Sequence, residues 1–210
     1  MKKLIVLFLL FVLVCAATLN AQNNIQKDQD FKEFLSLFPK KEFPFFALWD
    51  FDERTSFSTP LMSIPKNLYQ QFIVNYGVES YTEYCPEKYF WGFSALCRFP
   101  DKDSCIIIIA TNDAEAGCDE KWYLLTYTFD GNLIDKLWIF GRSHLKSSDN
   151  SYTKGTYLLA DGEIFENDID LSVKRYDPQG EEDKVIKYEY KFHIAPNGRF
   201  QKIEGGKVFE

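Results

Sequence analysis

From position 88 onward, the chain consists of short runs of β-branched and aromatic residues separated by turn signals. These runs predict strands near 88–99, 104–112, 120–129, 132–141, 153–160, 163–175, 184–195 and 199–204, with a further short one at 207–209. Asp-Gly and Asn-Gly pairs tolerate positive φ and suit tight hairpin turns, and they occur at Asp130-Gly131, Asp161-Gly162 and Asn197-Gly198. The pattern predicts an antiparallel β-meander of about eight strands.

Two short helices are predicted ahead of these strands. The first covers 30–38 and ends at Pro39, and its apolar stripe consists of Phe31, Phe34, Leu35 and Phe38. The second runs from Pro65 to Val74, where Leu68, Phe72 and Ile73 share a face. The polar residues 22–29 are expected to form a flexible arm.

The run from Cys105 to Ala110 is apolar on both faces, so the sheet must be covered twice. The N-terminal helices can cover one side, or the sheet can curl on itself. In a later run, Ile169, Leu171 and Val173 alternate with charged residues and are expected to face inward. The expected fold class is mainly β (α+β), a curved or partly closed meander with the two helices packed on it, forming one domain over 30–210.

The first 21 residues are typical of a cleavable secretory signal peptide. Lys2 and Lys3 precede an apolar run from Leu4 to Val14, and small residues follow, with cleavage expected after Ala21. The alternative is a lipoprotein anchored through Cys15, although Val14 stands where a small residue is expected. The apolar run is too short to span a bilayer, so the sequence predicts an exported protein, periplasmic or extracellular, without a transmembrane segment.

The charge balance argues against nucleic acid as a partner. Removing Lys2 and Lys3 from 24 basic residues leaves 22 against 31 acidic ones, a formal net charge of −9 for the mature chain. Such a chain repels phosphate backbones.

The acidic loop at 112–120 lacks the residue order of a calcium loop, and the sequence predicts neither a cofactor nor a metal site.

Four cysteines remain in the mature chain: Cys85, Cys97, Cys105 and Cys118. In an oxidising compartment they indicate two disulfides. If 88–99 and 104–112 form a hairpin, Cys97 and Cys105 both lie at its turn end and the other two at its far end. We therefore expect the pairs Cys97–Cys105 and Cys85–Cys118, the alternative being four buried free thiols.

Three functional hypotheses follow from the residues, and the first is favoured. Aromatics make up 17% of the chain, and a non-enzymatic binding domain would use this surplus, around Trp49, Trp91 or Trp138, to hold a protein, glycan or lipid. The second hypothesis is a secreted glycan-acting hydrolase that uses Asp50 with Asp52 or Glu53. The third is a carrier with an apolar cavity inside a half-closed sheet.

Neither histidine has a catalytic sequence context, and His144 and His193 are interpreted as surface or core residues.

The chain resembles several uncharacterised secreted bacterial domain families. The resemblance rests on the segment Phe31-x-x-Phe34-Leu35-x-x-Phe38-Pro39 and on the meander with Asp-Gly turns that follows it. The resemblance covers most of the mature chain. It implies a similar fold and no particular activity.

Overall fold

The computed structural model describes residues 24–48, 61–78, 90–114, 121–146, 152–179 and 182–208. A helix over 24–36 is followed by short elements, namely β1 (Phe45–Ala47), β2 (Met62–Ser63), α2 (Lys66–Phe72) and the 3-10 helix η1 (Val74–Tyr76). Eight longer strands complete the fold: β3 (Phe90–Arg98), β4 (Ile106–Ala114), β5 (Lys121–Tyr127), β6 (Leu133–Lys146), β7 (Tyr152–Ile164), β8 (Asp168–Gln179), β9 (Glu182–Ile194) and β10 (Phe200–Val208).

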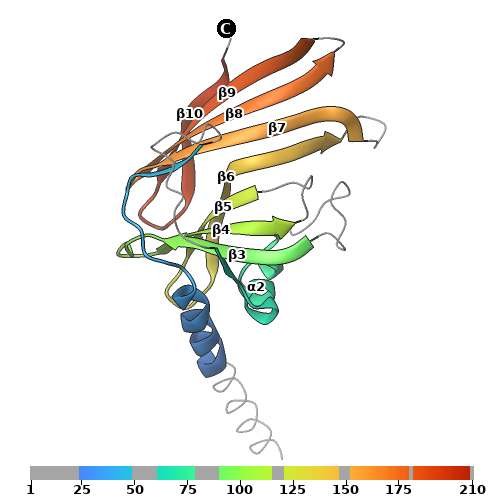
Figure 1. Cartoon of the computed structure of the whole chain (residues 1–210). Helices are drawn as coiled ribbons and strands as arrows, with labels where there is room; N and C mark the ends of the chain where they lie inside the picture. The colour runs from blue at the N-terminus through green and yellow to red at the C-terminus, as the bar shows by residue number, and fades with distance from the viewer. Residues whose placement is uncertain are drawn as a thin grey trace, which may run out of the picture.

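All of these strands belong to one antiparallel sheet that does not close. The neighbours follow the order of the chain from β10 to β2, and β1 pairs separately with β7 (Figure 1). The predicted mainly β meander with two short N-terminal helices is therefore confirmed. No helix within the described residues is long and apolar enough to cross a membrane.

The N-terminal helix begins earlier than predicted. Residues 24–29, which were expected to form a flexible arm, are helical, and that prediction is wrong from residue 24 onward. An ion pair between residues four positions apart explains the earlier start of the helix. Lys32 Nζ lies 2.6 Å from Asp28 Oδ2, and such pairs stabilise a polar helical turn. Lys27 Nζ also donates to Asn132 Oδ1 at 2.7 Å, which anchors this turn to the β5–β6 loop. The predicted signal peptide and Cys15 lie outside the described residues.

Two of the three predicted glycine turns are present, and the third is not. Gly131 and Gly198 adopt φ values of 78° and 82° in the β5–β6 and β9–β10 turns. Gly162 instead lies within β7, and the chain turns at 165–167, where Phe165 N–H donates to the Asp168 carbonyl at 2.8 Å. A Cβ at Gly162 would lie 2.7 Å from the Ile139 carbonyl oxygen. This glycine therefore permits a close approach of β6 and β7 and does not form a turn.

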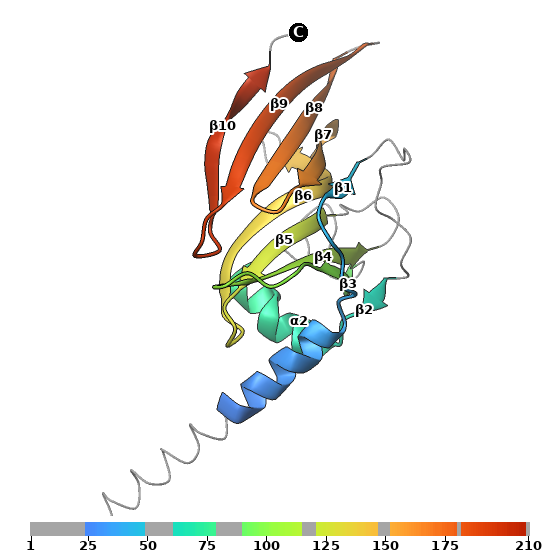
Figure 2. The same ribbon diagram turned by 90° about the vertical axis from the view of Figure 1, so that its left-hand side faces the viewer.

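β6 divides the sheet into two halves. Its first part, up to Gly141, pairs with β5, and its last part, from Gly141 onward, pairs with β7. Gly141 has a φ of 112°, a value that favours glycine at this bend. The pairing of β6 with β7 extends only to Ala160, so the rest of that edge of β7 is free. β1 pairs with this free part, with Phe45 opposite Ile164. The second half of the sheet thus folds back over the first (Figure 2).

Both expected ways of covering the sheet occur. On one face of β4, Ile106 and Ile108 pack in a core with the two helices, which lie beneath β3 and β4 in Figure 2. On the other face, Ile107 and Ile109 pack in a second core with residues of the folded-back half, such as Ile169. Leu171 and Val173 are also buried, so the predicted inward face of β8 is confirmed.

The β9–β10 turn closes one end of the folded sheet. The Gly198 carbonyl accepts a hydrogen bond from Thr126 Oγ1 at 2.8 Å, and Phe200 N–H donates to Asp135 Oδ2 at 2.9 Å. Ser104 Oγ donates to the Pro196 carbonyl. These bonds hold the turn against β5, β6 and the β3–β4 turn. Ile194 N–H, at the end of β9, also donates to the Asn167 carbonyl in the β7–β8 turn at 2.7 Å, so the β3–β4, β7–β8 and β9–β10 turns meet at this end.

Candidate functional site

The predicted Cys97–Cys105 disulfide is not formed. Both cysteines are buried and free, although the β3–β4 hairpin itself is present. Cys97 pairs in register with Ile109, four positions beyond Cys105. That offset corresponds to ~13 Å along a strand, whereas a disulfide requires Cα atoms within ~7 Å. The prediction failed because it placed Cys97 closer to the turn than the register does. Cys85 and Cys118 lie outside the described residues.

Of the predicted aromatic and acidic site residues, Trp91 and Trp138 fall within the described part of the chain. Trp49, Asp50, Asp52 and Glu53 lie outside the described residues. Trp91 is 67% exposed on β3. Trp138 is half-buried, and its Nε1 donates to the Phe140 carbonyl at 2.7 Å. Because β4 and β5 separate the strands that carry Trp91 and Trp138, these two side chains belong to different parts of the sheet.

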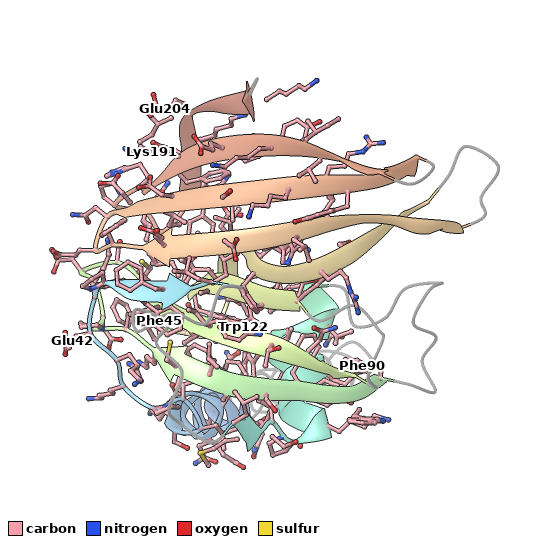
Figure 3. All side chains as sticks on the ribbon, turned by 45° about the horizontal axis from the view of Figure 1, so that its top comes forward. Glu42, Phe45, Phe90, Trp122, Lys191 and Glu204 are labelled. Carbon is pink, nitrogen blue, oxygen red and sulfur yellow. The ribbon has the colours of Figure 1, made fainter. Side chains whose placement is uncertain are left out.

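A first hollow lies on the second half of the sheet, on the polar face of β7 to β10, and we call it the charged-face hollow. Its volume is about 720 Å³, and its floor includes Gly205 and Gly206. Many of its charged side chains pair with one another: Lys187 Nζ lies 2.7 Å from Glu189 Oε1, and Lys191 Nζ lies 3.8 Å from Asp170 Oδ1. Lys191 and Glu204 are neighbours in the strand register and lie together in Figure 3, apart from Glu42.

A second hollow, of about 890 Å³, lies where the three turns meet, and we call it the turn-end hollow. The β3–β4 turn contributes 100–104, and the β7–β8 turn contributes Glu166 and Asn167. The end of β9 contributes His193 and Ile194, and the β9–β10 turn contributes Pro196. Two residues of the segment that leads into β1 complete the lining, namely Phe43 and Glu42, of which Glu42 is labelled in Figure 3. Binding residues concentrate on loops that a rigid scaffold holds in place, so this end of the sheet is the stronger candidate site.

Hydrogen bonds between the turns fix the shape of the turn-end hollow. Lys102 Nζ donates to Asn167 Oδ1 at 2.8 Å, and Ile194 N–H donates to the Asn167 carbonyl at 2.7 Å. Desolvation lowers the pKa of the Lys102 ammonium, an effect that the nearby Glu166 carboxylate opposes. Asn167, in the β7–β8 turn, thus links the β3–β4 turn to the end of β9, and these three segments are held in one arrangement.

His193, which lines the turn-end hollow, is paired with a carboxylate from the neighbouring strand. His193 Nδ1 lies 3.1 Å from Asp168 Oδ1, and the two residues are cross-strand neighbours in β8 and β9. Sequence reasoning treated His193 as surface or core, because nothing in the sequence indicates which residue of β8 lies opposite it. The side chain of His144 lies outside the described part of the chain.

An ion pair holds one of the acidic residues that line the turn-end hollow. Arg98 forms a bidentate pair with Asp101, with Nη2 lying 2.7 and 2.6 Å from the two carboxylate oxygens. This pair fixes the start of the β3–β4 turn.

Within the described residues, no group of three or more His, Cys, Asp or Glu side chains is placed to hold a metal ion.

No family model, curated protein or solved structure that was compared with the chain matches it. The likeness to uncharacterised secreted bacterial domains therefore stays a prediction.

Proposed function

We propose that the chain is an exported, non-enzymatic binding domain whose ligand occupies the turn-end hollow. The observation that carries this proposal is the convergence of three turns and the 42–43 segment on one hollow of about 890 Å³. Its lining combines apolar surface, from Phe43, Pro100 and Pro196, with side chains that donate and accept hydrogen bonds. Binding sites for small ligands commonly have this mixed lining.

The interior of the folded sheet supports the carrier hypothesis less well. Phe99, Trp122 and Ile139 are almost completely buried in the core between the two halves of the sheet. Their side chains occupy the space that a hydrophobic ligand would need. Both hollows described here lie at the surface and carry charged residues.

A hydrolase is the second candidate, because His193 lines the turn-end hollow and pairs with Asp168. A carboxylate that orients a histidine is one part of a nucleophilic site. Ser104 lines the same hollow, but its hydroxyl donates to the Pro196 carbonyl. A catalytic serine would instead donate to the imidazole, so the binding function is favoured.

A fragment screen monitored by the amide spectrum of the ¹⁵N-labelled mature protein tests the binding function. We expect fragments to shift amides at 101–104, 166–167 and 193–195. Shifts confined to the charged-face hollow, or none at all, would contradict the proposal. A fluorophosphonate probe tests the hydrolase alternative, since covalent labelling of the wild type that is lost in Ser104→Ala would favour the enzyme.

A further inference from the structure

The turn-end hollow has a flat aromatic surface in its wall. The ring of Phe43 stacks on that of Phe99, with a centroid distance of 4.3 Å and an interplanar angle of 7°. Phe99 is buried and holds the Phe43 ring in one orientation. Phe43 itself is only half-buried and lines the hollow. A fixed ring of this kind offers an apolar platform to a flat ligand at little cost in side-chain entropy.

Hydrogen-bonding side chains surround this platform. Glu42, Asp103 and Glu166 are exposed carboxylates in the lining, and they accept hydrogen bonds from hydroxyl groups. Such bonds to a charged acceptor are shorter and stronger than those between neutral groups. The Asn167 side-chain amide and Lys102 supply donors.

The charge of the hollow restricts the ligand further. Its lining contains four carboxylates, from Glu42, Asp101, Asp103 and Glu166, and one lysine. The whole chain carries a formal net charge of −7. An anionic ligand would therefore be repelled both at the site and during approach.

We infer that the turn-end hollow binds a neutral saccharide, an inference that rests on the proposed binding function. A pyranose ring presents a flat face of C–H groups and a rim of hydroxyl groups. The face matches the Phe43 platform, and the rim matches the surrounding carboxylates and amide. A hollow of about 890 Å³ has room for a short oligosaccharide.

Titration calorimetry with soluble tetrasaccharides tests this inference. The probes are neutral tetramers of glucose, N-acetylglucosamine, mannose and xylose, with tetragalacturonic acid as the anionic comparison. We expect at least one neutral tetramer to bind and the anionic one not to bind. Phe43→Ala should weaken binding at least tenfold, and Phe43→Tyr should largely retain it.

Phe46→Ala is the matched control, because Phe46 belongs to the same segment, contacts Phe165 edge to face and does not line the hollow. It should bind as the wild type does. If Phe43→Ala fails to fold, Asn167→Ala decides, since this exposed amide lines the hollow, and it should also weaken binding. Equal binding by the wild type and the folded lining variants would overturn the inference, as would preferred binding of the anionic tetramer.

The fragment screen separates the two levels of the proposal. If no saccharide binds while fragments still shift the amides of the turn-end hollow, the saccharide inference fails and the binding function stands. If neither saccharides nor fragments perturb the hollow, both fail.

Discussion

Replacing Gly162 with alanine tests whether the close approach of β6 and β7 sets the fold of the sheet. The added Cβ would lie 2.7 Å from the Ile139 carbonyl oxygen and 3.2 Å from the Ile139 Cβ. Ordinary contacts begin near 3.4 Å, so the two strands would have to separate by about 0.7 Å. Ala47 and Leu171 flank Gly162 in the neighbouring strands, and their hydrogen-bonded pairing resists that movement.

The expected loss of stability follows from two opposing effects. Overpacking in a well-packed region costs about 1–3 kcal/mol. The reduced freedom of the unfolded chain offsets roughly 0.4–1 kcal/mol of this cost. We therefore expect Gly162→Ala to lower the free energy of unfolding by about 1–2 kcal/mol.

Urea unfolding followed by tryptophan fluorescence measures this change. With a slope of about 2 kcal/mol per molar urea, the midpoint should fall by about 0.5–1 M. Gly206→Ala is the control, because a Cβ at Gly206 meets nothing within 4 Å, and its midpoint should stay the same or rise. A Gly162→Ala midpoint equal to that of the wild type would refute the steric reasoning.

Three further predictions concern buried groups. Tyr127→Phe removes the hydroxyl that donates to the Phe72 carbonyl at 2.6 Å, and it should lower the unfolding free energy by about 1 kcal/mol in thermal melts. Burial raises the pKa of the Cys97 thiol from 9.0 to about 12. As the pH rises above 9, this thiol therefore ionises in the unfolded chain before it does so in the folded one. Each pH unit from 9 towards 12 should lower the free energy of unfolding by about 1.4 kcal/mol. Cys97→Ala should flatten that dependence in urea titrations, and an unchanged slope would contradict it. Without reductant, alkylation of Cys97 and Cys105 should require unfolding, and peptide mass spectrometry should recover each one separately.

The meander was predictable because its signals are local. Turn residues such as Gly131 and Gly198 and the alternation of Ile169, Leu171 and Val173 act over a few positions. The apolar run in β4 even indicated that both faces of the sheet are covered. Gly162 was misinterpreted because Asp-Gly is also compatible with a strand when another backbone comes close, and only the three-dimensional structure shows that the Ile139 backbone is the neighbour.

The candidate site was much less predictable. Its residues come from segments far apart in the chain, such as Phe43, Lys102, Asn167 and His193. None of them forms a short motif, because the turns meet only after the sheet has folded back. The disulfide prediction failed for a related reason, since the strand register, which places Cys97 opposite Ile109 and four positions away from Cys105, is set only when the sheet forms.

The two partners of β6 also have a consequence for the order of folding. The hairpins from β3 to β10 connect neighbouring segments, so their pairing closes short loops and can be fast. β1 pairs with β7, most of the domain away, and the N-terminal helix contacts the β5–β6 loop. Synthesis releases the N-terminus first, yet the segments that pair with it, β7 and the β5–β6 loop, are made long afterwards. The aromatic N-terminal segment therefore stays without its native partners until most of the domain has been made, and in this interval its apolar side chains are exposed.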